Sequence, residues 1–411
     1  MARLMTTNQH SRPGPRAVGE VAWLFLRLGC TAFGGPVAHI ALMREECVRR
    51  QWVSEEHFVD LIGVTNLIPG PSSTELAIYL GYLRAGWLGL VLAGICFIMP
   101  AMLLALVLAW AYVSYGALPQ IAWLFYGLQP VIVGIVTQAI WNLARTIFKG
   151  VLAVALALLV LVLYLLGVNV LILLFGGGLL CAILRWLLVH WRKRHLPPAS
   201  LTLLFPAPLF WHDLWPRLAA MPAAIGPGLL AVVPTVGLGL LFLTFLKEGA
   251  VVYGSGYTLL AFLRADLVEN LHWLTDKQLL DAVSIGQLTP GPVFTTATFI
   301  GYVLAGWPGA LLATLGIFLP SFLFIPLIHP LARHLRKSAW TAALLDGVNV
   351  AALALMTGVL FQLGQRALSD FVTWLLALLT FAVLLRFKVN SIWLLLAGAI
   401  VGIARFLLFK G

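Results

Sequence analysis

The sequence carries very little charge. Only 10% of its 411 residues are Asp, Glu, Lys or Arg, against roughly 25% in an average soluble protein. Hydrophobic residues make up 61% of the chain, and its mean hydropathy is +0.99. A single soluble core stops growing at about 250–300 residues and needs a polar shell, which this composition does not supply. The lack of charge therefore excludes a water-soluble globule and predicts a chain whose surface faces lipid.

Among the charged residues the acidic ones are the minority, with 15 Asp and Glu against 26 Lys and Arg, and the formal net charge is +11. This excess does not indicate nucleic acid, because the basic residues stand at the ends of apolar runs. Clusters at residues 192–194 and 333–337 are examples. A membrane protein fixes its orientation by this distribution. We expect a lipid bilayer as partner, and no nucleic acid.

Paired cysteines and catalytic motifs are also missing. The four cysteines (Cys30, Cys47, Cys96 and Cys181) have no paired spacing, which favours small apolar core residues over ligands or disulfides. The sequence has no H-E-x-x-H, G-x-S-x-G, nucleotide, haem or Walker motif. These absences argue against a membrane-embedded reductase or hydrolase and against a primary pump. We expect no enzyme, no cofactor and no metal.

What the sequence does have is a series of long apolar runs. A helix needs about 20 apolar residues to cross the hydrocarbon core of a bilayer. Two shorter runs, at residues 18–33 and 236–253, are followed by short pieces broken by glycine and proline. The long runs cover residues 86–114, 118–144, 150–167, 169–189, 307–331, 338–363, 367–386 and 389–408. They predict an all-α polytopic membrane protein with roughly 10–13 membrane segments.

The sequence repeats itself after about 220 residues. Pro69-Gly70-Pro71 returns as Pro290-Gly291-Pro292, and Gly86-Trp87 returns as Gly306-Trp307. The loop at 114–118 has no basic residue, whereas its equivalent holds Arg333, Arg336 and Lys337. Because basic loops stay inside the cell, the copies must face opposite ways. We predict two inverted-topology repeats that contain broken or half helices.

These patterns divide the chain into four parts. Residues 1–17 are expected to form a cytosolic tail, because no apolar signal core with a cleavage site follows them. The first transporter repeat is expected at 18–190 and the second, inverted one at 236–411. Inversion requires an extra crossing between the two, and the proline-broken apolar stretch 218–237 in the linker 191–235 can provide it.

Inverted repeats with interrupted helices are typical of secondary transporters, which bind substrate at the repeat interface near mid-membrane. Here Pro69 ends a short helix, Gly70 allows the turn, and Pro71 suits the first position of the next helix. The amides of residues 72–74 would then be free donors at the positive end of a helix, which suits an anion. An ordinary loop is the alternative, but it explains neither the short flanking runs nor the recurrence of the element in both halves.

A second break, Phe33-Gly34-Gly35-Pro36, follows the same logic; its repeat mate Gly254-Ser255-Gly256 lacks the proline. His39 suits a role at the helix end as well as it suits a role toward substrate or proton. Arg27 and its mate Lys247 could neutralise an anion or extend to the membrane surface. The predicted substrate-binding residues are Arg27, Phe33, Gly34, Gly35, Pro36, His39, Pro69, Gly70, Pro71, Ser72, Ser73, Thr74, Lys247, Gly254, Ser255, Gly256, Pro290, Gly291, Pro292, Thr295 and Thr296.

Two acidic residues within apolar segments are candidates for energy coupling. An ionised Glu75, just after the Pro-Gly-Pro turn, would repel an anion. It must be protonated, paired with a cation such as Arg27, or turned away. Glu248 directly follows Lys247 and is either its local neighbour or a second proton carrier.

Several of these motifs resemble the chromate ion transporter family in its long, two-domain form. The resemblance rests on Phe33–Pro36 followed by Ala38-His39-Ile40, on Pro-Gly-Pro followed by Gly81-Tyr82, and on Phe97 with Pro100, and it extends from about Leu24 to Lys410. It implies efflux of chromate from the bacterial cytoplasm through the inner membrane. The second copy departs from the pattern and has Thr296 in place of Glu75. The first copy is therefore the better candidate for substrate and coupling residues.

Three functions stay open on the sequence alone. In the leading one the chain exports chromate, driven by the membrane potential, by proton coupling or by both; exit of a dianion from a cell that is negative inside is favourable by about 2.3 kcal/mol per charge per 100 mV. Uptake or exchange of sulfate or a related oxyanion is the second, because amides and hydroxyls hardly distinguish two tetrahedral dianions. A membrane-embedded reductase is the third. A homodimer is left open.

Overall fold

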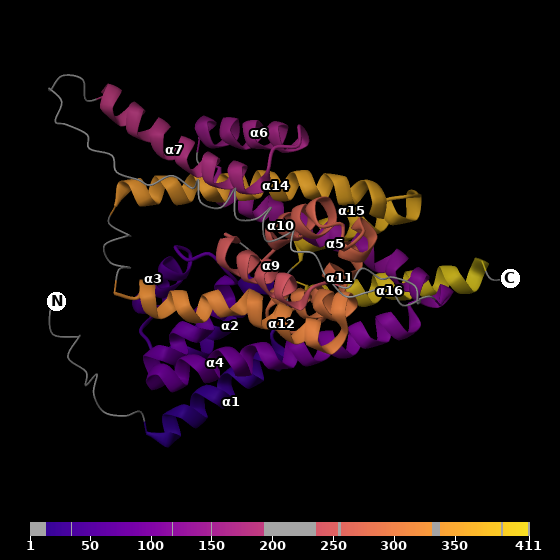
Figure 1. Cartoon of the computed structure of the whole chain (residues 1–411), viewed down its shortest axis with the longest axis horizontal. Coiled ribbons are helices and arrows are strands. Elements are labelled where there is room, and N and C mark those ends of the chain that lie inside the picture. Colours follow the sequence, from indigo (N-terminus) through magenta and orange to yellow (C-terminus); the bar gives the residue numbers. More distant parts are fainter. Residues whose placement is uncertain are drawn as a thin grey trace, which may run out of the picture. The chain divides into compact units, whose positions relative to one another are not determined.

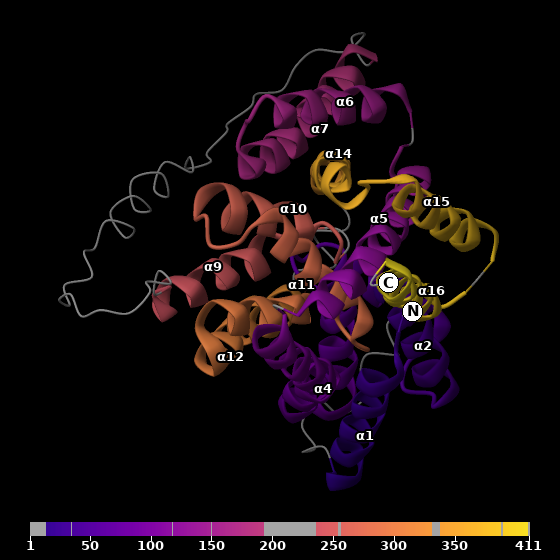
Figure 2. The same cartoon turned by 90° about the vertical axis from the view of Figure 1, so that its right-hand side faces the viewer.

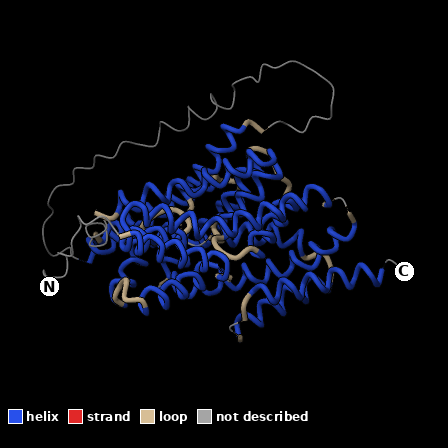
Figure 3. The backbone as a smooth tube through the Cα atoms, turned by 90° about the horizontal axis from the view of Figure 1, so that it is seen from below, coloured by secondary structure: helices blue, strands red, loops and turns tan. Residues whose placement is uncertain are grey.

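The computed structural model describes residues 14–33, 35–116, 118–148, 150–192, 236–253, 256–330, 338–387 and 389–409. These residues form helices joined by turns, and no strand occurs among them (Figure 3). Six helices are long and apolar enough to cross a membrane, and two shorter apolar helices accompany them. The all-α polytopic prediction is confirmed. Residues 193–235, with nearly all of the predicted linker and extra crossing, lie outside the described part.

The helices recur in order, each about 220 residues after its counterpart, as expected of a duplicated chain (Figures 1 and 2). The pairs are α1 (Pro15–Thr31) with α9 (Leu238–Val251), α2 (Gly35–Arg49) with α10 (Leu259–Leu263) and η2 (Arg264–Asn270), α3 (Glu55–Thr65) with α11 (Asp276–Leu288), α4 (Ser72–Tyr115) with η3 (Val293–Thr295) and α12 (Thr296–Ile328), α5 (Pro119–Ile147) with α14 (Ala339–Ala367), α6 (Val151–Leu165) with α15 (Phe371–Arg386), and α7 (Val170–Arg192) with α16 (Ser391–Phe409).

Helices α4 and α12 are each two helices joined by a sharp turn. The turn falls at Gly86 (φ 59°, ψ −148°) and at Gly306 (φ 62°, ψ −150°), where the left-handed backbone requires glycine. A methyl group added to Gly81 would lie 2.3 Å from the carbonyl oxygen of Gly89, so the short arm folds back onto the long one in direct backbone contact. These two sharp turns come in addition to the breaks predicted at residues 33–36 and 69–71 and at their repeat mates.

The long arms of α4 and α12 run antiparallel (Figure 1). Near its start, the α4 arm places Gly94 against the ring of Phe322, late in α12. Near its end, the ring of Tyr112 lies 5.2 Å from that of Phe299, in the short arm of α12 that folds back along its long arm. Equivalent crossing helices that run in opposite directions are what an inverted repeat produces.

Small residues allow the later helices to pack closely. A methyl group on Gly127 of α5 would lie 1.9 Å from the carbonyl oxygen of Gly398 in α16, and one on Gly402 would lie 2.1 Å from that of Trp123. Close backbone approach is the usual basis of helix association in lipid, where burial of apolar side chains gives no net gain. The scaffold around the helix breaks is thus held by van der Waals packing.

Candidate substrate site

Four helix breaks meet where the two repeats touch. We call them the first break tip (residues 32–36), the first Pro-Gly-Pro tip (69–71), the second break tip (252–256) and the second Pro-Gly-Pro tip (290–292). Of the residues predicted for this site, Gly34, Gly254 and Ser255 lie outside the described part. The half-buried Phe33 lies in the first break tip.

The tips exchange backbone hydrogen bonds across the repeats. The amide of Gly70 donates to the carbonyl of Val252 over 2.7 Å, and the amide of Gly291 donates to the carbonyl of Ala32 over 2.8 Å. Gly70 and Gly291 are repeat mates, as are Ala32 and Val252. A contact made twice with the roles exchanged is the mark of a two-fold relation, and each Pro-Gly-Pro tip therefore joins the break tip of the other repeat.

Buried polar atoms without a partner concentrate around these tips. Leaving such an atom unpaired costs about 1–3 kcal/mol, so each one calls for an explanation such as a ligand or a water. Among the described residues, eight of the nine such side-chain atoms belong to six residues of the tips and the helices beside them: His39, Thr74, Glu75, Glu248, Gln287 and Ser321.

The first Pro-Gly-Pro tip presents an acid. Gly70 has φ +136°, and a methyl group on it would lie 2.5 Å from Glu75 Oε1 and 3.0 Å from Ser321 Oγ. Glu75 is fully buried and neither of its carboxylate oxygens has a hydrogen-bond partner among the described residues. Burying an unpaired charge is expensive, so this packing suits a carboxyl group that carries a proton.

The helix start after this tip differs in detail from the prediction. Pro71 is the N-cap and not the first helical residue. The predicted free amide at Thr74 is wrong, because that amide donates to the Pro71 carbonyl over 2.8 Å in a tightened first turn. Thr74 instead leaves its hydroxyl unpaired, while Ser73 is buried next to it.

The second Pro-Gly-Pro tip has no acid. Gly291 has φ +87°, and a methyl group on it would lie 3.1 Å from Ala101, the repeat mate of Ser321. The hydroxyl of Thr295 donates to the Pro292 carbonyl and that of Thr296 to the Val293 carbonyl, each over 2.8 Å. Both hydroxyls predicted to bind substrate are therefore bonded to their own backbone.

The first break tip faces residues of the second repeat. Gly35 has φ +76°, and a methyl group on it would lie 3.2 Å from the hydroxyl oxygen of Tyr257. Gly256 in turn lies beside Pro36, with 3.7 Å between an added methyl and the proline ring. His39 Nε2 lies 3.1 Å from the carbonyl oxygen of Ala32, which fits the helix-end role, and His39 Nδ1 has no partner.

The two predicted cations are each held by a carboxylate. Arg27 donates to Glu46 over 2.5 Å, and Lys247 donates to Asp266. Glu46 and Asp266 are themselves 220 residues apart, so the same ion pair occurs in both repeats. In this structure Arg27 thus pairs with Glu46 rather than with Glu75, which the sequence had left as one option.

Glu46 also receives hydrogen bonds from two neighbouring arginines, Arg49 and Arg50. Burial opposes ionisation of this carboxyl, but the guanidinium groups of Arg27, Arg50 and Arg49 outweigh burial and lower its pKa to about 2. Glu46 is therefore a stable anion at the arginine-rich end of α2, outside the six candidate spans.

Glu248, the other predicted coupling residue, is fully buried, and neither carboxylate oxygen has a hydrogen-bond partner among the described residues. Lys247 Nζ lies 3.8 Å from Glu248 Oε1 but donates its hydrogen bond to Asp266. Glu75 lies at the first Pro-Gly-Pro tip, and Glu248 lies one turn before the second break tip, to which that Pro-Gly-Pro tip is hydrogen-bonded.

Sequence reasoning missed four participants: Glu46, Tyr257, Gln287 and Ser321. An acid at position 46 that returns at 266, in step with the cations at 27 and 247, was a signal that could have found the ion pairs. The other three have no such signal, because their repeat mates (Val37, Asn66 and Ala101) differ in chemistry.

Comparison with known proteins agrees with this duplicated architecture. The profile of the chromate transporter family matches residues 19–182 and again residues 239–403, once in each repeat. The chain belongs to the chromate transporter family. The resemblance drawn from the sequence motifs is confirmed, and it extends to both copies.

Named relatives align with the chain over nearly their whole length. A chromate transport protein of Cupriavidus metallidurans is 35% identical, covering 92% of this chain and 91% of that protein. A probable chromate transport protein of Synechococcus elongatus is 33% identical, covering 88% of each. A chromate transport protein of Pseudomonas aeruginosa is 29% identical, covering 95% of this chain and 93% of that protein. No solved structure matches the chain. The family and the helices together make this chain a multi-pass membrane transport protein.

Proposed function

We propose that this transporter exports chromate from the bacterial cytoplasm through the inner membrane, with its N-terminus in the cytoplasm and the repeats 18–190 and 236–411 as its transport halves. The observation that carries the proposal is the meeting of four helix breaks from both repeats, with unpaired buried polar atoms gathered around them. Inverted-repeat transporters hold their substrate at such a place.

The tips suit an oxyanion because helix starts supply donors without burying a full counter-charge. Half-helices begin at Ser72 and at Val293, and α2 begins at Gly35. Their first turns, with nearby hydroxyls, can replace the water around a tetrahedral anion. Arg27 and Lys247 add positive charge at the ends of α1 and α9, and they could reach the anion in a conformation that releases their carboxylate partners.

Glu75 is proposed as the coupling residue. An ionised Glu75 would repel an anion bound among the four tips, so anion binding and protonation of Glu75 favour each other. A proton held by Glu75 would then move with the transport cycle. The membrane potential supplies a further driving force for an exported dianion.

Uptake of labelled chromate into inside-out proteoliposomes tests the proposal. We expect uptake that rises with an inside-positive potential and is absent from protein-free liposomes. Parallel vesicles with labelled sulfate, and with a pH gradient in place of the potential, identify the substrate and the coupling ion. Sulfate transport without chromate transport would replace the proposed substrate, and transport of neither anion would overturn the function.

A further inference from the structure

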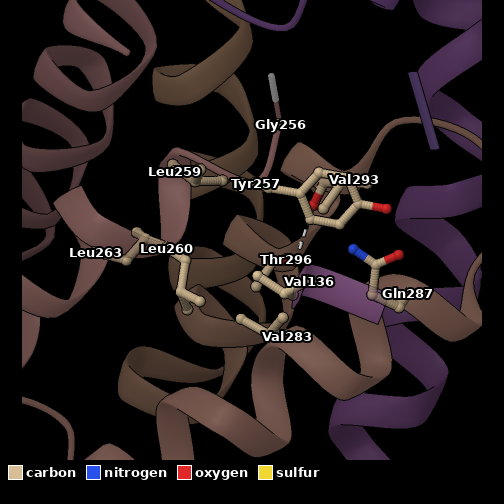
Figure 4. Close-up of a pocket in the computed structure, with 10 residues that line it drawn as sticks. All are labelled: Val136, Gly256, Tyr257, Leu259, Leu260, Leu263, Val283, Gln287, Val293 and Thr296. Carbon is tan, nitrogen blue, oxygen red and sulfur yellow. Dashed lines mark hydrogen bonds between the residues drawn. The ribbon is translucent and has the colours of Figure 1, made fainter. Parts of the chain in front are cut away.

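The interface between the first break tip and the second Pro-Gly-Pro tip carries polar groups that the proposed function has not used. Tyr257 follows the second break tip, and Gln287 lies near the end of α11, just before Pro290. Figure 4 shows the Gln287 amide directly beside the ring of Tyr257. Gln287 Nε2 has no hydrogen-bond partner among the described residues, although only 7% of the residue is exposed.

These groups lie at the start of a helix from the other repeat. The Tyr257 hydroxyl is 3.2 Å from the position of a methyl group on Gly35, the first residue of α2. A buried N–H donor without an acceptor, a tyrosine hydroxyl and the positive end of a helix therefore converge, and each of them favours a negatively charged oxygen.

The equivalent interface on the other side of the two-fold relation has the opposite character. There the unpaired atoms are the carboxylate oxygens of Glu75 and the hydroxyls of Thr74 and Ser321. A dianion would meet a carboxylate there, at a depth where charges interact more strongly than in water. The interface with Tyr257 and Gln287 carries no carboxylate among the residues described at it.

We propose that Tyr257 and Gln287 are ligands of the transported oxyanion, which binds against the start of α2 on the acid-free side of the tips, while the equivalent side around Glu75 serves the proton. This inference rests on the proposed function and deepens it. In the present structure this site is too small for the anion, because the cavity beside Tyr257 and Gln287 measures about 10 Å³, room for a single water (Figure 4). Opening of the tips admits the anion, and the Tyr257 hydroxyl and the Gln287 amide N–H then donate to it.

Two substitutions test this assignment in proteoliposomes. Tyr257→Phe removes one hydroxyl, and we expect the KM for the transported oxyanion to rise about tenfold, as for loss of a hydrogen bond to a charged group. Gln287→Glu replaces the amide donor by a carboxylate at the same size, and we expect transport to fall at least a hundredfold. Asn66→Asp, the same change at the exposed repeat mate of Gln287, is the matched control and is expected to leave KM unchanged.

A second measurement separates binding from structure. Among the described residues, the titratable groups near these tips are His39, Tyr257 and, on the other side, Glu75, Tyr253 and Glu248, with Lys247 and Asp266 next to Glu248. Tyr257→Phe is expected to raise KM without changing the pH profile, whereas Glu75→Gln changes the pH profile without raising KM. If Gln287→Glu does not fold, as judged by gel filtration and thermal unfolding, Tyr257→Phe decides alone.

The experiments distinguish failure of the proposed function from failure of the assignment of Tyr257 and Gln287 as ligands. If the wild-type protein transports neither chromate nor sulfate, the proposed function fails. If the wild-type protein transports and Tyr257→Phe keeps the wild-type KM, the assignment of these ligands is wrong while the function stands. A lower maximal rate at unchanged KM would equally overturn it, because that result indicates a role in conformational change.

Discussion

The two Pro-Gly-Pro tips share a backbone and differ in chemistry. Each has a glycine with positive φ whose amide donates to the break tip of the other repeat. At the first tip, Gly70 lies against Glu75 and Ser321, and the Thr74 hydroxyl has no partner. At the second tip, Gly291 lies against Ala101, and the neighbouring threonine hydroxyls are bonded to their own backbone.

Comparison of the two tips separates the features that both repeats share from those that only one repeat has. The reciprocal backbone bonds and the charged pairs recur, because the inverted halves must join and hold their broken helices. The buried acid occurs at one Pro-Gly-Pro tip only. On the assignment proposed above, the scaffold holds a proton site and an anion site at two equivalent places, without bringing the like charges together.

The largest effect is expected when alanine replaces the glycine of each Pro-Gly-Pro tip, Gly70 or Gly291. Gly70→Ala forces a methyl group to within 2.5 Å of Glu75 Oε1 on a positive-φ backbone, whereas the atom nearest to a methyl group on Gly291 is Ala101 Cβ at 3.1 Å. The backbone strain costs about 1–2 kcal/mol at either site, but only Gly70→Ala also displaces the acid. We expect Gly70→Ala to abolish transport and Gly291→Ala to reduce it several-fold, measured as initial uptake per folded protein. Equal losses would show that the two tips do not differ in function.

The second test removes the charge of the acid. Glu75→Gln mimics the protonated carboxyl, so we expect substrate binding to survive while transport becomes independent of pH. Thr296→Val, at the repeat mate of Glu75, is the control and is expected to keep the wild-type pH profile. Uptake measured between pH 5.5 and 8 distinguishes the variants. A Glu75→Gln variant with an unchanged pH profile would make Glu75 structural and direct the same experiment to Glu248→Gln.

The third test compares the two ion pairs. Lys247→Ala removes the cation that neutralises Asp266, and both partners are mostly buried, so we expect about 2 kcal/mol lower stability. Arg27→Ala should cost about 1 kcal/mol or less, because 43% of the Arg27 side chain is exposed and Glu46 keeps Arg49 and Arg50. Thermal unfolding in detergent measures both losses. Transport abolished by Arg27→Ala in a protein of near wild-type stability would support the proposed contact of Arg27 with the anion, and transport that survives would limit Arg27 to the ion pair.

The sequence predicted the scaffold well because its signals are local. The apolar run at 150–167 became α6 (Val151–Leu165), and the glycine at each sharp turn of α4 and α12 was visible in the repeat. Run length, helix-breaking residues and repeated spacing need no knowledge of tertiary contacts. The helix-start geometry was less accurate, since a tightened first turn used the amide of Thr74.

The partners of the site residues could not be predicted in the same way. Ser321 reaches Gly70 and Glu75 from a distant part of the chain, and Gln287 meets Tyr257 only because two tips of the same repeat converge. The back-bonding of Thr295 and Thr296 shows a second limit, because a hydroxyl in a helix start can satisfy itself locally. Residue type alone does not reveal whether such a hydroxyl bonds to its own backbone or is available to a ligand.

The smallest effect concerns the charged end of the first repeat, where Glu46 binds three arginines and Asp266 has no such cluster. The pKa of Glu46 is about 2 in the folded protein against an ordinary value of 4.5. A depressed pKa means that the unfolded chain takes up the proton first as the pH falls. The stability that Glu46 contributes is therefore complete above pH 4.5 and is lost as the pH drops toward 2.

We expect the wild-type unfolding temperature to fall across this window, and Glu46→Gln to start lower and to fall less steeply. Glu45→Gln, at the exposed neighbouring position, is the control and should follow the wild-type curve. If Glu46→Gln keeps the wild-type slope, the arginine cluster does not hold this carboxylate, and the charged ends of the two repeats differ less than their contacts indicate.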